Sequence, residues 1–257
     1  MAKLRALGHM VSLSRLVRER AAFVLRQALR RPVVRCYHLK DSGLAFYLRH
    51  GTPDVNTFEQ MFDEGHYELP REIAASLPSG EVTAVDLGAN VGMFGLWLRS
   101  RFPQARITAF EPDPDNARVL SQTAAANARN GDWRVVEAAA GNRDGEITFV
   151  TGDFTNSRVA QAGEAGTAVP LVDVFPFFDG ADFVKIDIEG AEWDLTSDPR
   201  FAELRAPVVA FEYHPGQAVG DPRSEAIAAL ERAGYETMEG ELETLPGHGM
   251  IWGWRGS

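Results

Sequence analysis

The sequence has one cysteine, Cys36, in 257 residues. An internal disulfide is therefore excluded, and a single thiol suits a reducing compartment, so we expect a cytoplasmic protein. The chain also lacks an uncharged apolar run of the roughly 18 residues that a membrane-spanning helix needs, and we expect that it does not cross a bilayer. A hydrophobic content of 45% excludes a disordered chain, and the length fits one large domain plus an extension, or two small domains.

Basic residues are fewer than acidic ones, and they are most concentrated at the N-terminal end. The chain has 26 Lys and Arg against 36 Asp and Glu, a net charge of −10. Residues 1–40 hold ten of the basic residues and one acid, a balance of +9, so residues 41–257 hold 16 bases and 35 acids, a balance of −19. This acidic body has no basic face to neutralise phosphates, and we expect no nucleic-acid partner.

The basic segment, 1–40, has the pattern of an amphipathic helical extension. Residues 9–31 contain no Gly or Pro, and apolar residues recur there at spacings of three and four. The apolar positions are Met10, Leu13, Leu16, Val17, Ala21, Val24, Leu25 and Ala28, and Arg15, Arg18, Arg26 and Arg30 fall on the other face. We expect the helix to pack on the body or on a second subunit, or to lie on an anionic membrane surface. A targeting peptide is less favoured, because no apolar core or small-residue cleavage site is present.

The body is predicted to be an α/β domain. Residues 41–80 form a lead-in, and residues 81–257 form the main domain with an insertion at about 141–180. Near-continuously apolar strands alternate with helices of 10–15 residues, which implies a parallel sheet that is buried on both faces. The predicted lead-in elements are a strand at 42–50 and helices at 56–67 and 70–78. The predicted main-domain strands are 82–88, 105–112, 133–141, 182–190 and 207–216, with helices at 92–102, 114–129 and 224–234, extra strands at 145–150 and 167–175, and an antiparallel pair at 235–240 and 249–255.

The first strand of this domain ends in a glycine turn that is typical of a nucleoside cofactor site. Asp86 is followed by Gly88, Asn90 and Gly92, and the next strand ends at Glu111, 19 residues past Gly92. Glycines at such a turn let the backbone approach a ligand closely. A carboxylate at the tip of the second strand can accept hydrogen bonds from both hydroxyls of a ribose.

The details of the turn favour S-adenosylmethionine over a dinucleotide. The dinucleotide fingerprint requires a glycine where this chain has Asn90. The carboxylate of Asp86 would repel a pyrophosphate but suits the ammonium of a methionine moiety. The small side chain of Ala138, at the end of the third strand, leaves room for adenine against the backbone.

Four segments together resemble one known family. They are VDLGANVGMFG, FEPDPDNARVL, VVEAAAGNRDGEITF and DFVKIDIEGAEWDL, and they look like the FkbM family of S-adenosylmethionine-dependent methyltransferases over roughly residues 60–215. The resemblance implies a class I methyltransferase fold, which is a Rossmann-like, doubly wound α/β sheet, mostly parallel with an antiparallel C-terminal strand. It also implies O-methylation of hydroxyls, often on sugars or natural products, and places Pro112 of the FEPDP segment with the cofactor-binding residues.

Candidate catalytic residues follow the fourth and fifth strands, because ligands of open α/β sheets bind at the carboxyl ends of the strands. Lys185, Asp187 and Glu189 alternate on one side of the fourth strand. His214 is the first candidate for the base that takes the proton of an acceptor hydroxyl, and Asp187 is the second. Lys185 either holds these carboxylates or orients the acceptor, and Glu189 either acts in catalysis or stabilises the start of the next helix.

Two of these residues, together with Glu212 of the fifth strand, also raise the question of a metal. Asp187, Glu212 and His214 could together bind Mg²⁺, but the fifth strand lacks an adjacent acidic pair and we do not favour it. Zinc is not expected with one Cys and scattered His residues.

The sequence therefore predicts an O-methyltransferase that acts on a saccharide or a glycosylated product. Tyr67, Asn156 and Glu212 are predicted to contact the acceptor. Two alternatives stay open: an NAD(P)-dependent oxidoreductase, and a non-catalytic cofactor-binding protein on the same scaffold.

Overall fold

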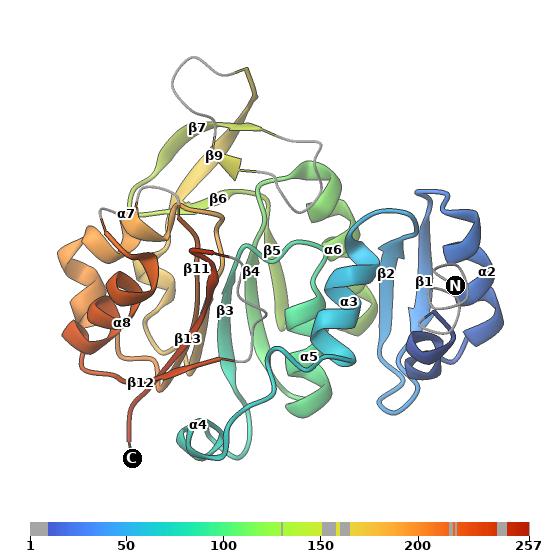
Figure 1. Ribbon diagram of the computed structural model, residues 1–257, viewed down its shortest axis with the longest axis horizontal. Coiled ribbons are helices and arrows are strands. Elements are labelled where there is room, and N and C mark those ends of the chain that lie inside the picture. The colour runs from blue at the N-terminus through green and yellow to red at the C-terminus, as the bar shows by residue number, and fades with distance from the viewer. Residues whose placement is uncertain are drawn as a thin grey trace.

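A computed structural model describes residues 10–129, 131–150, 158–159, 165–215, 218, 220–240 and 246–256. Its centre is a seven-stranded sheet with the order β12-β13-β11-β10-β3-β4-β5 (Figure 1). The strands are β3 (Thr83–Leu87), β4 (Arg106–Phe110), β5 (Trp133–Val136), β10 (Phe183–Ile186), β11 (Val208–Tyr213), β12 (Glu236–Glu239) and β13 (Gly249–Trp254). The strands β3, β4, β5, β10 and β11 pair in parallel, and β13 pairs antiparallel with both β11 and β12. The doubly wound fold with its antiparallel C-terminal pair is thus confirmed.

Helices cover both faces of this sheet, as its apolar strands require. The helices are α5 (Met93–Arg101) and α6 (Pro114–Asn127) on one face, and α7 (Glu192–Ser197), η3 (Pro199–Glu203) and α8 (Pro222–Arg232) on the other. Successive side chains of β3 serve opposite faces: Ala84 packs in the cluster that contains Trp97 of α5, and Val85 packs in the cluster that contains Trp193 of α7. Both faces of the sheet are therefore buried at its centre, next to the edge where the site is built.

The third predicted strand, 133–141, is wrong as one strand. The strand β5 ends at Val136, whose carbonyl accepts a hydrogen bond from the N–H of Ala138 at 3.0 Å, and this tight turn takes the chain out of the central sheet. The next residues form β6 in a separate four-stranded sheet of order β6-β9-β7-β8, which contains the predicted insertion. Its strands are β6 (Ala139–Gly141), β7 (Gly145–Val150), β8 (Arg158–Val159) and β9 (Thr167–Asp173), and the short helix η2 (Phe175–Phe177) follows.

The continuous helix predicted at 9–31 is also wrong. A helical turn at 10–13 runs into η1 (Ser14–Leu16), and the chain then becomes extended at Val17, which forms a β-bridge with Leu39. The helix α2 (Arg20–Leu29) starts afresh after Glu19, whose carboxylate accepts the backbone N–H of His38. Val17 is completely buried at this bridge, and burial of its apolar side chain is more favourable than exposure on a helix face turned to solvent.

A β-hairpin that the sequence did not predict in full follows α2. The strand β1 (Val34–His38) pairs antiparallel with β2 (Ala45–Arg49), so the hairpin spans residue 40, where the sequence suggested a division. Two short helices, α3 (Asp54–Phe62) and α4 (Arg71–Ser76), lead from it into the central sheet. In the part of the chain that the structure describes, every helix is too short or too polar to cross a membrane.

Candidate functional site

The carboxyl ends of β3, β10 and β11 meet at one edge of the sheet and enclose a cavity of about 400 Å³. The turn after β3 supplies one wall, and the residues after β10 and β11 supply another. The lining side chains that carry polar chemistry are Asn56, Thr57, Gln60, His66, Tyr67, Asn90, Lys185, Asp187, Glu189, Glu212, His214 and His248. The predicted glycine turn and the predicted catalytic residues therefore share one cavity.

The glycine turn has a backbone that needs glycine. Gly88, Asn90 and Gly92 have positive φ values of 77°, 49° and 88°. A Cβ atom on Gly88 would lie 1.7 Å from the carbonyl oxygen of Asp187, so only glycine allows the ends of β3 and β10 to approach this closely. The turn after β3 thus lies in direct contact with Asp187, the residue that follows β10.

Glu111 lies behind this turn and holds it in place. Its Oε2 accepts the backbone N–H of Asn90 at 2.7 Å, and its Oε1 accepts the N–H of Asp113 at 2.9 Å. Burial raises the pKa of Glu111 to about 7. Each oxygen has a second lone pair, so the carboxylate can still accept a ribose hydroxyl. Pro112 is half-buried beside it, and Ala138 is buried just past the end of β5.

Asp86 lies underneath the cavity rather than on its surface. The side chain is completely buried, and neither carboxylate oxygen meets a hydrogen-bond donor among the described residues. Burial raises the pKa of Asp86 to about 6, although the nearby charge of Lys185 opposes this rise. Asp86 is therefore a buried carboxylate behind the cavity lining, and its nearest positive charge is Lys185.

Lys185 joins the two walls of the cavity. Its Nζ lies 3.0 Å from the Gly88 carbonyl, 3.0 Å from Oδ2 of Asp187 and 3.5 Å from Oδ1 of Asp86. Burial disfavours the charged amine, but Asp187 and Asp86 outweigh burial and raise the pKa of Lys185. Of the two roles that the sequence left open, the contacts of Lys185 are those of a residue that holds carboxylates.

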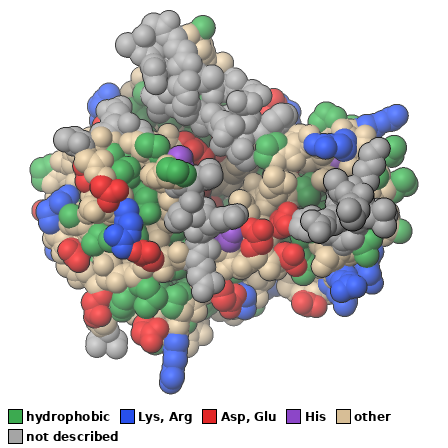
Figure 2. Space-filling view, viewed as in Figure 1, with side chains coloured by type: hydrophobic (Ala, Val, Ile, Leu, Met, Phe, Trp, Pro, Cys, Tyr) green, Lys and Arg blue, Asp and Glu red, His purple; other side chains and the backbone are tan. Residues whose placement is uncertain are grey.

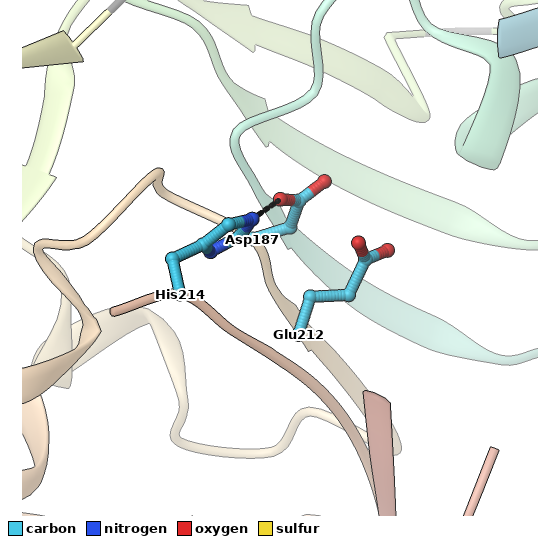
Figure 3. A group of neighbouring side chains, drawn as sticks. All are labelled: Asp187, Glu212 and His214. Carbon is cyan, nitrogen blue, oxygen red and sulfur yellow. Dashed lines mark ion pairs between the residues drawn. The ribbon is translucent and has the colours of Figure 1, made fainter. Parts of the chain in front are cut away.

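The side chains of Asp187, Glu212 and His214 point toward one another (Figure 3). The Nε2 atom of His214 lies 3.8 Å from Oδ1 of Asp187 and 3.6 Å from Oε2 of Glu189. Burial and the charge of Asp187 raise the pKa of Glu212 to about 7 and that of Glu189 to about 8. Asp187, Glu212 and His214 each offer one ligand atom, and these atoms lie within 4.8 Å of one another.

Glu192, which the sequence analysis missed, orients His214. Its Oε1 lies 2.8 Å from Nδ1 of His214, and because a carboxylate only accepts, Nδ1 carries the hydrogen and Nε2 faces the cavity. Burial opposes charge on the ring, but the hydrogen bond and charge of Glu192 outweigh it and raise the pKa of His214 to about 10.

The same carboxylate also takes the role that the sequence left open for Glu189. Glu192 has no exposed surface and accepts the N–H groups of Ile188 at 3.0 Å and Gly190 at 2.8 Å, just before α7. Glu189 has a φ of 54°, and its carboxylate faces His214. The signal for Glu192 was present in the sequence as a second acid in the segment IEGAE, directly before a buried Trp.

Tyr67, predicted to contact the acceptor, lines the cavity from the opposite side. Its ring packs against Phe94 and Trp252, and its hydroxyl donates a short hydrogen bond to Oε1 of Glu212. Burial and the charge of Glu212 raise the pKa of the Tyr67 hydroxyl, so it stays a donor. Tyr67 and Glu212 thus come together, whereas Asn156 lies outside the described residues.

A doubly wound sheet with this turn, this strand-tip acid and this cavity defines a class I, S-adenosylmethionine-dependent methyltransferase. Residues 86–237 match the model of the methyltransferase FkbM domain, which is more than half of the chain. The chain therefore belongs to the FkbM methyltransferase family. The family assignment favours methyl transfer over the oxidoreductase alternative.

Individual relatives are more distant. The methyltransferase sdnD of Sordaria araneosa is 28% identical over 229 residues, which cover 74% of this chain and 85% of that protein. Among solved structures, M. jannaschii TYW2 in complex with AdoMet is 16% identical with a TM-score of 0.44, covering 86% of this chain and 84% of the other. Magnesium protoporphyrin IX methyltransferase of Synechocystis PCC 6803 with bound SAM is 11% identical with a TM-score of 0.45, covering 78% and 81%.

Proposed function

We propose that the protein transfers the methyl group of S-adenosylmethionine to a hydroxyl of a saccharide or a glycosylated natural product. The observation that carries this proposal is the pair formed by His214 Nε2 and Asp187 Oδ1, 3.8 Å apart in the cavity that the glycine turn lines. When bound, S-adenosylmethionine supplies an electrophilic methyl group on a positively charged sulfur. The chain must supply the remaining parts, which are binding, alignment and removal of a proton.

The cofactor-binding residues fit that molecule. The backbone of Gly88, Asn90 and Gly92 leaves room for close approach, and Glu111 can accept ribose hydroxyls at the tip of β4. Asp86 and Asp187 share one cation, Lys185, so this group of three keeps a formal negative charge beside the turn, which favours a bound cation. Pro112 and Ala138 follow the ends of β4 and β5, the second and third strands, and complete the proposed cofactor-binding set.

His214 serves as the base in this proposal. An aliphatic hydroxyl is a poor nucleophile until its proton is removed, and Nε2 of His214 faces the cavity where the hydroxyl would lie. The acidic surroundings raise the pKa of the free ring to about 10, so the ring must first lose its own proton. A positive charge bound beside the ring lowers that pKa by like-charge repulsion. Asp187 is the second candidate base, and Lys185 holds its carboxylate in place by donating a hydrogen bond to Oδ2.

The walls of the cavity support a polyhydroxyl acceptor. Glu189 and Glu212 can accept hydrogen bonds from several hydroxyls, and the asparagine, glutamine and histidine side chains of the opposite wall can both donate and accept. Phe94 and Tyr67 add an apolar surface on which a sugar ring can pack. Asn156 stays a predicted acceptor contact.

A divalent cation such as Mg²⁺ is a second candidate for the same position. The three candidate ligands are Asp187, Glu212 and His214. Each has one polar atom hydrogen-bonded to a buried partner, which is Lys185 for Asp187, Tyr67 for Glu212 and Glu192 for His214. Such held ligands are typical of metal sites. The fifth strand supplies only one acid, Glu212, and two carboxylates with an imidazole make a modest Mg²⁺ site, so we place the proton-accepting role first.

The experiment that tests the proposal is an acceptor screen that follows release of S-adenosylhomocysteine. Free sugars, glycosides and glycosylated products are offered with S-adenosylmethionine, with and without a chelator. We expect release that depends on a hydroxyl acceptor and that survives the chelator. If the chelator abolishes release of S-adenosylhomocysteine and added Mg²⁺ restores it, the reaction requires a metal ion. Binding of S-adenosylmethionine without release for any acceptor would support the non-catalytic alternative.

A further inference from the structure

Helix α2 presents an apolar face to solvent. Ala21, Leu25, Ala28 and Leu29 fall on one side of the helix, at offsets of four, seven and eight residues, and all four are exposed. The side chains of Leu25 and Leu29 are 60% and 57% exposed. The predicted apolar stripe is thus split, because its first half, with Leu13 and Val17, is buried and its second half points outward.

The opposite side of α2 fixes the helix to the protein. Phe23 is completely buried and lies edge-on to the rings of Tyr37 and His50. Gln27 accepts a hydrogen bond from His50, and Arg26 donates to the Tyr37 hydroxyl. The outward face is therefore held in place and has no freedom to turn its leucines inward.

The exposed apolar side chains are concentrated in this part of the molecule. The exposed large hydrophobic residues of the described chain are Val11, Leu25, Leu29, Val33 and Met238. Four of the five lie within residues 11–33, and Met238 is on β12 at the other end of the sheet. Such clustering of exposed apolar side chains marks an interaction surface.

Exposed basic residues share this segment with the apolar side chains. The exposed basic residues of the segment 10–40 are Arg15, Arg18, Arg20, Arg30, Arg31, Arg35 and Lys40. The only acid in that segment is Glu19, which is occupied by His38. In the space-filling view, blue and green side chains alternate along the lobe at the right-hand edge, where α2 lies (Figure 2). We call this surface, Val11 to Lys40, the basic lobe.

We propose that the basic lobe docks the protein on a bilayer surface that contains anionic phospholipids. A bilayer offers both partners that the surface requires, since acyl chains accept the leucines and lipid phosphates accept the guanidinium groups. Charge argues against a second copy on the same face, because two positive lobes would repel each other. The docking is independent of the methyl-transfer chemistry, and none of its residues lines the cavity.

The experiment measures co-sedimentation of the full chain with vesicles. One set contains phosphatidylcholine alone, and the other contains phosphatidylcholine and phosphatidylglycerol in equal parts. We expect binding to the anionic vesicles only, with loss of binding at high salt. The double variant Leu25→Ser, Leu29→Ser should weaken the partition coefficient by about tenfold or more, and so should Arg30→Glu, Arg31→Glu, because each removes a separate contribution to binding.

Matched controls lie elsewhere on the surface. Met238→Ser removes an exposed apolar side chain outside the basic lobe, and Arg71→Glu, Arg143→Glu reverses two exposed arginines outside it. Both controls should bind vesicles like the unaltered chain, and all variants should keep S-adenosylmethionine binding. The proposal fails if the unaltered chain stays in solution with anionic vesicles at low salt. It also fails if the leucine variant binds vesicles normally, which would indicate a general polyanion site. A third contradicting result is a leucine variant that changes from dimer to monomer without any change in vesicle binding.

Discussion

Oε1 of Glu192 lies 2.8 Å from Nδ1 of His214, and Glu192 has no exposed surface. The same carboxylate accepts two backbone N–H groups of the segment between β10 and α7. One buried side chain therefore fixes both the loop that contains Glu189 and the ring that faces the cavity. This arrangement makes Glu192 a positioning residue for His214.

Replacing Glu192 by Gln should lower kcat and leave the affinity for S-adenosylmethionine unchanged. The amide keeps the size of the side chain but loses the charge, and its NH₂ group cannot accept the N–H groups that the carboxylate accepts. We expect kcat to fall by about tenfold or more, since a misoriented base loses most of its advantage. Asp194→Asn, on the exposed side of the same helix, is the control. Equal kcat values for the two variants would contradict the role.

Lys185 should be required for stability because it neutralises Asp86. Lys185→Met leaves a buried carboxylate without its cation, which we expect to cost about 3 kcal/mol in the free energy of unfolding. Adding Asp86→Asn removes that charge and should recover part of the loss. Urea unfolding of the two single variants and the double variant measures the coupling. A double variant that is less stable than Lys185→Met would show that the two residues are not a pair.

Glu111→Gln should weaken S-adenosylmethionine binding by about tenfold or more, as expected for the loss of hydrogen bonds to a charged group. The amide cannot accept the N–H groups of both Asn90 and Asp113, so the glycine turn loses a support as well as an acceptor for the ribose. Calorimetry measures the affinity. Glu137→Gln changes an exposed carboxylate just past the end of the neighbouring strand and should bind normally. Equal affinities would show that Glu111 has only a local structural role.

Stability should fall in acid because of His50. Its ring is buried between Tyr37 and Gln27, and burial together with the charge of Arg26 lowers its pKa to about 4. The unfolded chain takes up this proton near pH 6.5, so below that pH it binds more protons than the folded chain. The stabilisation is complete above pH 6.5 and is lost as the pH falls toward 4, by up to about 3 kcal/mol.

The comparison for this prediction is His50→Gln, which keeps one acceptor and one donor but does not titrate. Denaturant unfolding is measured for both proteins between pH 4 and 7. The unaltered protein should lose more stability over that range than the variant does. Parallel pH profiles would mean that His50 already carries its proton in the folded state or is not buried in solution.

Local patterns explain which features could be predicted from sequence. The glycine turn, Glu111 and the strand tips at Asp187 and Glu212 follow from residues that are close in sequence, so the cavity could be anticipated. Two features depended on partners far along the chain. Val17 leaves the helical pattern because it meets Leu39, and Glu192 acquires its role only when β11 brings His214 beside it. The early end of the third strand is instead a local turn, in which the N–H of Ala138 bonds back to the carbonyl of Val136, and the apolar run at 133–141 gave no signal for it.

The most direct test of the central claim combines turnover with cofactor binding for His214→Gln and Asp187→Asn. The unaltered protein should release S-adenosylhomocysteine in equal amount to an O-methylated saccharide. Both variants should bind S-adenosylmethionine with unchanged affinity, and the turnover of His214→Gln should be about a hundredfold lower, the contribution of a positioned base. Full turnover by both variants, while Asp86→Ala abolishes it, would contradict the assignment of the base and leave only the cofactor site.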